Sequence, residues 1–153
     1  MPTEPLCWPP ELEDHYYSIK DSALRAGRLC RYTSVHFKDD VKNIDELVEG
    51  WLTQIDTAGV DIQNAITSVY RESRGSGSKP RWIVNALPLM YEAAGRLIEA
   101  TQKSVDAWKA DQPAILTLWL SKGERQAADI RRHLLSGPPP TPKVKPNGRE
   151  GRE

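Results

Sequence analysis

Apolar residues recur every seven positions between residues 41 and 69. The first position of each heptad is β-branched throughout, and the fourth positions continue the same stripe: Val41, Val48, Ile55, Ile62 and Val69, then Ile44, Trp51, Ala58 and Ala65. This repeat is typical of a long helix with a coiled-coil-like seam. A seam of this kind needs other helices to cover it. The pattern therefore predicts an all-α bundle, with Trp51 in its core.

Two alternative start signals precede this long helix. Asp39 or Asp40 would begin it early, whereas Asn43 followed by Glu46 resembles a capping box and would begin it late. Inside the helix, Gly59 indicates close approach by a neighbour, a local bend or simple tolerance of glycine. The glycine- and serine-rich residues 75–78 predict a flexible link at its end.

A first amphipathic segment precedes the long helix. We expect it to begin at Pro10 and to lose its pattern after Arg31, because Thr33 and its neighbours are weaker helix formers. The connection should lie between residues 32 and 39, with Phe37 packing back onto the core. The apolar stripe of this segment consists of Leu12, Tyr16, Ile19, Ala23, Ala26 and Cys30.

A third helix should run from about Ser78 or Pro80 to about Asp111. Pro88 predicts a kink, or a fresh start capped by Asn85, because proline lacks the N–H that a helix interior uses. Its stripe consists of Ile83, Leu87, Met90, Ala94, Leu97, Thr101, Val105 and Trp108.

A fourth helix has the clearest end signals. Asp111 is the expected N-cap, Pro113 lies in the first turn and Gly137 marks the C-terminal end. Its stripe consists of Leu116, Trp119, Leu120, Ala127, Ile130 and Leu134. Short links between successive helices favour an antiparallel, up-down four-helix bundle.

The sequence divides into three parts. Residues 1–9 predict an extended N-terminal arm, residues 10–137 the helical bundle, and residues 138–153 a disordered, proline-rich and basic tail. The bundle is long enough to bury a substantial core as one domain.

The composition bears on the expected cellular compartment and on membrane insertion. Only Cys7 and Cys30 are present, too few for a disulfide framework, and the longest apolar run, residues 114–120, is too short to cross a bilayer. We therefore expect a cytoplasmic protein that does not insert into a membrane.

Charge is balanced overall but uneven along the chain. The 21 basic residues equal the 21 acidic ones, yet residues 1–70 have 6 basic and 12 acidic side chains and residues 71–153 have 15 and 9. In the predicted bundle, basic residues gather at the end where the second and third helices are linked. The candidate contacts for a phosphate or a partner are Arg71, Arg74, Lys79, Arg81, Arg131 and Arg132.

Catalytic and metal motifs are not evident in the sequence. Inward-facing Glu-x-x-His pairs would indicate a di-iron bundle, but His15, His36 and His133 are preceded three positions earlier by Leu12, Thr33 and Ile130. Phosphate loops, nucleophile elbows and zinc spacings are missing as well. We therefore expect no cofactor and no metal, and favour a role other than catalysis.

The sequence favours a non-catalytic adaptor or assembly subunit that binds a protein partner or a second copy. One alternative is a nucleic-acid-associated subunit that contacts phosphates through the basic pole. The other is an enzyme with an unrecognised site.

Overall fold

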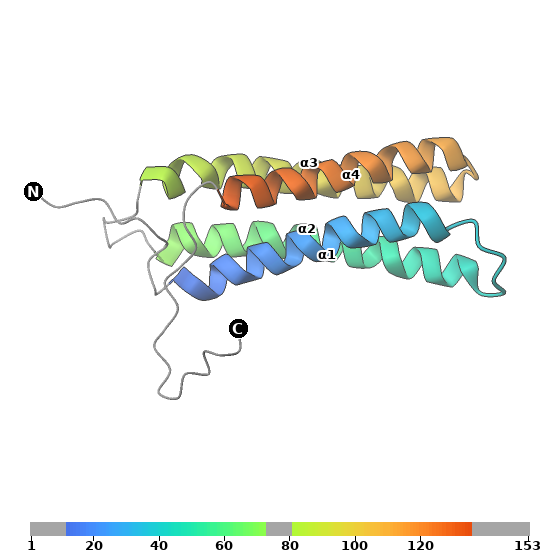
Figure 1. Ribbon diagram of the computed structural model, residues 1–153, viewed down its shortest axis with the longest axis horizontal. Coiled ribbons are helices and arrows are strands. Elements are labelled where there is room, and N and C mark those ends of the chain that lie inside the picture. The colour runs from blue at the N-terminus through green and yellow to red at the C-terminus, as the bar shows by residue number, and fades with distance from the viewer. Residues whose placement is uncertain (1–11, 73–80, 136–153) are drawn as a thin grey trace, which may run out of the picture.

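The chain forms an all-α, antiparallel four-helix bundle, as the heptad pattern predicts. A computed structural model describes residues 12–72 and 81–135, except for the side chains of residues 81–83. Each helix packs along the next, and α4 packs back against α1, which closes the ring (Figure 1). The described helices are α1 Glu13–His36, α2 Ile44–Glu72, α3 Arg81–Lys109 and α4 Pro113–Leu134.

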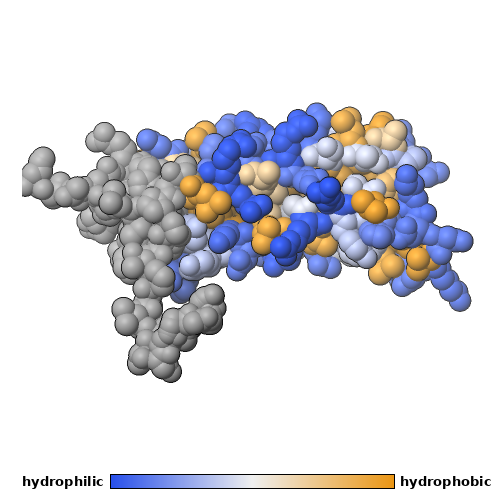
Figure 2. All heavy atoms as spheres, viewed as in Figure 1, coloured by the Kyte–Doolittle hydropathy of each residue, from blue (hydrophilic) through white to orange (hydrophobic). Residues whose placement is uncertain are grey.

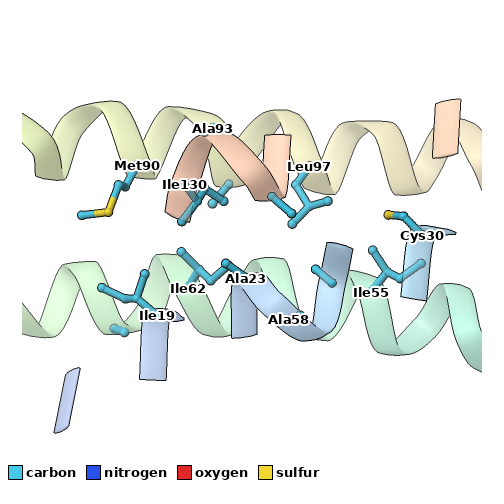
Figure 3. Packing of buried hydrophobic residues seen from close by; sticks show 14 of the residues in the cluster. Ile19, Ala23, Cys30, Ile55, Ala58, Ile62, Met90, Ala93, Leu97 and Ile130 are labelled. Atoms are coloured by element: carbon cyan, nitrogen blue, oxygen red, sulfur yellow. The ribbon is translucent and has the colours of Figure 1, made fainter. Parts of the chain in front are cut away.

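The predicted stripes meet in one core. All six residues of the first predicted stripe, which starts at Leu12 just before α1, are buried. Ile19, Ile62 and Met90 project into the space between the helix layers (Figure 3). The buried face of α2 is wider than a two-position seam, because Leu52 and Ile66 are buried beside the heptad positions. Such a broad stripe suits a helix with neighbours on two sides.

The connection between α1 and α2 differs from the sequence prediction. α1 begins at Glu13 and continues to His36, past the predicted fading of its pattern. Thr33 is fully buried, and packing of this kind overrides its modest helix propensity. Phe37 then packs onto the core as predicted, with its ring 6.3 Å from that of Trp108.

Of the two possible starts for α2, the later one is correct. The helix begins at Ile44, and the N–H of Leu47 donates to the carbonyl of Asn43. Val41 therefore precedes the helix and is 43% exposed, so its assignment to the seam is wrong.

The predicted role of Asp111 is also wrong. Asp111 adopts a left-handed conformation, with φ of 56°, after the end of α3. Its N–H donates to the Trp108 carbonyl, and the N–H of Gln112 reaches back to Ala107. This hydrogen-bond pair is a Schellman motif, in which aspartate takes the place usual for glycine. Asp111 ends α3, and α4 then starts at Pro113 without a side-chain cap.

α3 continues through Pro88 as one helix, so a fresh start at Asn85 is excluded. Proline is tolerated here on an exposed face. Because it lacks an N–H, the carbonyl of Val84 loses its usual helical donor.

Three tryptophans on the predicted stripes lie at the edge of the core. Trp51 is half-buried against the ring of Tyr32 at 5.0 Å, and Trp108 is packed similarly beside Phe37. Trp119 is also half-buried, with the ammonium group of Lys122 4.9 Å from its ring. The sequence prediction that these rings are core residues is therefore only partly correct.

Several predictions concern residues outside the described ranges. These are the arm at residues 1–9, the link after residue 72, Gly137 as a terminator and the tail at residues 138–153. None of the described helices is long and apolar enough to cross a membrane.

Candidate functional site

α3 packs closely against α2 near the middle of the bundle and leaves a groove toward one end. The close approach occurs at Gly59, where a Cβ atom would lie 2.7 Å from Cγ1 of Ile98. Any larger residue at this position would force Ile98 to move. One turn further along α2, Gln63 already lines the groove, so the two helices close at Gly59 and open beyond it.

The groove has a volume of about 790 Å³ and lies wholly between α2 and α3. Tyr70, Leu89 and Tyr91 are large apolar or aromatic side chains that line it and remain well exposed. Exposed rings beside aliphatic groups are common at protein interfaces. The full lining consists of Gln63, Thr67, Tyr70, Pro88, Leu89, Tyr91, Glu92, Gly95, Arg96 and Glu99.

The charged groups of this groove are mainly carboxylates. Glu92 pairs with Arg96 at 3.4 Å, which leaves Glu99 as an excess negative charge in the lining. The amide of Gln63 donates to the Tyr91 carbonyl at 3.4 Å and links the two helices. This chemistry suits a ligand that brings positive charge and donors.

A second hollow, of about 260 Å³, lies between α2 and α3 nearer the other end of the bundle. Asp56 and Asp106 give it two negative charges. Oδ1 of Asp56 is buried and has no hydrogen-bond partner among the described residues. Both hollows on this side of the bundle are therefore acidic.

The opposite side of the bundle, formed by α1 and α4, carries a basic hollow of about 180 Å³. Small residues such as Gly27 and Ala127 make room for it, and Arg28, Arg31 and Arg131 surround it. Figure 2 shows this side, where hydrophilic side chains separate the apolar patches.

The negative charge in this basic hollow does not balance the positive charge of its three arginines. Glu124 is its acidic residue and lies 3.9 Å from Arg31, at the limit of an ion pair. Nε of Arg131 is buried and has no hydrogen-bond partner within the described ranges. A half-buried guanidinium without a carboxylate is costly, so an external anion would stabilise it.

The structure brings together only part of the predicted basic pole. Arg71 is exposed in the last turn of α2, whereas Arg131 and Arg132 lie in the last turn of α4, the helix diagonal to it. Arg132 forms an ion pair with Asp129, and Arg131 lies beside α1. Positive charge in the last turn also complements the helix dipole. Arg74 and Lys79 lie outside the described residues, as does the side chain of Arg81.

Sequence reasoning missed Arg28 and Arg31. Both lie on the outward face of a helix in the acidic half of the chain, so a count of charge along the sequence hides them. Their position beside Arg131 follows from the packing of α1 on α4, which connects residues about 100 positions apart. The signal in the sequence was their i, i+3 spacing, which places both arginines on one face of the helix.

Cys30 is a buried thiol within the core. Burial, with a smaller contribution from the negative charge of Glu124, raises its pKa from 9.0 to about 12. Because the thiolate is the reactive form, Cys30 is a poor nucleophile at neutral pH. It fits as a packing residue against Gly123, where a Cβ atom would lie 3.0 Å from its Sγ.

His15 and His36 each form a hydrogen bond with a carboxylate. His15 lies 3.0 Å from Glu72 and joins the start of α1 to the end of α2, while His36 lies 2.7 Å from Asp39. Within residues 12–72 and 81–135, no three His, Cys, Asp or Glu side chains converge as a metal site would require.

Comparisons with known proteins add no functional information. No protein-family model matches this chain, and the searches of curated proteins and of solved structures found no match either. Any function must therefore be inferred from the grooves and charges described above.

Proposed function

We propose that this protein is a non-catalytic adaptor or assembly subunit that binds a basic protein surface in the groove between α2 and α3. The observation that supports the proposal is the groove itself, in which Tyr70, Leu89 and Tyr91 remain exposed beside an excess carboxylate. If these side chains served stability alone, they would contribute more when buried, since burial of one large apolar side chain contributes about 1.5–3 kcal/mol.

The charge of the groove selects the chemistry of its partner. Glu92 and Glu99 exceed Arg96 in number, and the acidic hollow at Asp56 extends the negative charge along the same side. Arginine suits this surface particularly well, because its guanidinium stacks on tyrosine rings and forms paired hydrogen bonds with carboxylates. We therefore expect the partner to present arginine or lysine beside an apolar anchor.

A displayed library of random peptides tests this proposal without assuming which protein the partner is. The immobilised full chain should enrich peptides with net positive charge and at least one aliphatic or aromatic residue. Leu89→Ser should remove the enrichment, because this side chain lines the groove. Leu118→Ser is the matched control, since Leu118 is similarly exposed but lies on α4 outside the groove.

Three results would contradict the proposal. They are no enrichment, enrichment of acidic peptides, or equal loss in the Leu118→Ser control. Thermal unfolding of both variants should match that of the wild type, which shows that any loss of binding does not come from loss of the fold.

A further inference from the structure

Hollows on opposite sides of the bundle carry opposite net charge, and each side has a half-buried charged group with an unsatisfied atom. Oδ1 of Asp56 lacks a donor on the side formed by α2 and α3, and Nε of Arg131 lacks an acceptor on the side formed by α1 and α4. Neither residue forms an ion pair within the described part of the chain. Each side therefore presents the charge that the other side needs.

Two close contacts establish how the helices are aligned along the bundle axis. A Cβ on Gly27 would lie 3.5 Å from the Cβ of Ala127, and a Cβ on Gly123 would lie 3.7 Å from the Cβ of Ala100. Residue 27 is thus level with residue 127, and residue 123 with residue 100. Neighbouring helices are antiparallel and advance about 1.5 Å per residue. These two pairs therefore determine which residue of α3 is level with any given residue of α1 or α4.

The arginines of the basic side and the carboxylates of the acidic side lie at similar positions along the bundle axis. By this alignment Arg131 lies level with residue 92 of α3, Arg28 with residue 97 and Arg31 with residue 100. Glu92 therefore lies level with Arg131, and Glu99 lies within about 2 Å of Arg31 along the axis. The contact of Gly59 with Ile98 places Asp56 of α2 close to the same level as Glu99.

We infer that the partner of the α2–α3 side is the α1–α4 side of a second copy of this chain. A copy displaced sideways, without a shift along the axis, places its α4 over α3 and its α1 over α2. Its Arg131 then faces Glu92, while its Arg31 faces the region of Asp56. This inference rests on the proposed function and names the partner of the same groove.

Such a contact joins two different surfaces, so it does not close on itself. Each added copy leaves one free acidic side and one free basic side, which is the geometry of an open row. Charge drives the contact, so it should weaken as salt shortens the screening length to about 3 Å at 1 M. A symmetric pair through two α2–α3 sides would instead oppose like charges.

Sedimentation velocity across a concentration series tests the inference on the full chain. At low salt the mean mass should rise steadily with concentration beyond a dimer, and at 1 M salt it should return to that of the monomer. A monomer at every concentration and salt would overturn the inference. The peptide library tests the proposed function separately. A failure of the self-association inference can therefore be distinguished from a failure of the proposed function.

Two neutralised variants identify the surfaces. Glu92→Gln with Glu99→Gln weakens only the acidic side, and Arg28→Gln with Arg31→Gln weakens only the basic side; all four residues are solvent-exposed. Each variant alone should stay monomeric. An equimolar mixture should form a 1:1 dimer and grow no further, because one intact side of each kind remains.

A matched control removes two charges elsewhere. Asp45→Asn with Glu49→Gln changes exposed acidic residues of α2 that line none of the three hollows, and it should associate like the wild type. A mixture of the two neutralised variants that stays monomeric contradicts the inference. So does a closed wild-type dimer that neither variant affects.

Discussion

The two sides of α3 are packed in different ways. Toward α4, small residues allow close contact: a Cβ on Gly123 would meet Leu97 at 3.5 Å and Ala100 at 3.7 Å. Toward α2, contact is close at Gly59, but from Gln63 onward the helices leave a groove of about 790 Å³. One side of the helix serves mainly stability, and we propose that the other serves binding.

Two leucines on α3 give the largest contrast between these sides. Leu97 is 0% exposed and Leu89 is 46% exposed. Leu97→Ala removes buried methyl groups and leaves a cavity, so it should lower the free energy of unfolding by about 3 kcal/mol. Leu89→Ala should change it by less than about 0.5 kcal/mol. Chemical denaturation measures both, and similar losses would show that the groove belongs to the core.

Two glycines locate the point where the groove opens. Gly59→Ala forces a methyl group against Ile98, and this strain should exceed the gain in helix propensity, so unfolding should become easier by about 1–2 kcal/mol. At Gly95 the nearest atom is Nε2 of Gln63 at 3.4 Å, the end of a flexible side chain. Gly95→Ala should therefore raise stability by up to about 1 kcal/mol. Reversed signs would place the close contact elsewhere.

The pH dependence of stability tests whether water is excluded from the closely packed core around Cys30. The folded state holds the Cys30 pKa at about 12, above its usual value of 9.0. The folded protein therefore binds more protons than the unfolded chain above pH 9, and stability is lost as the pH rises from 9 toward 12. Between pH 8 and pH 10 the loss from this group should be about 1.4 kcal/mol.

Cys30→Ala provides the comparison, because all other ionisable groups remain the same. Its stability should fall less steeply with pH than that of the wild type. Equal slopes would mean that water reaches the thiol in the folded protein.

Sequence periodicity predicted the helices and most of the core, because stripes such as that of α1 depend on local spacing alone. Helix ends were predicted less well. Asp111 is suited both to an N-cap and to a left-handed C-terminal position, and only the contacts made by Gln112 distinguish the two. Val41 continues the heptad in sequence but lies before the helix begins.

The candidate sites were harder to predict. The basic hollow depends on α1 packing beside α4, and the groove depends on the close approach at Gly59, where the sequence left three explanations open. Neither arrangement follows from the order of residues along the chain. Arg131 was identified by its charge, but its neighbours Arg28 and Arg31 required the three-dimensional structure.

Amide chemical-shift mapping with a basic peptide enriched from the library tests the central claim most directly. We predict that shifts concentrate on the groove residues Gln63, Thr67, Tyr91 and Gly95, and that Leu89→Ser suppresses them while the rest of the spectrum stays unchanged. Shifts spread over α1 and α4, or equal binding by Leu89→Ser, would contradict a binding role for the groove between α2 and α3.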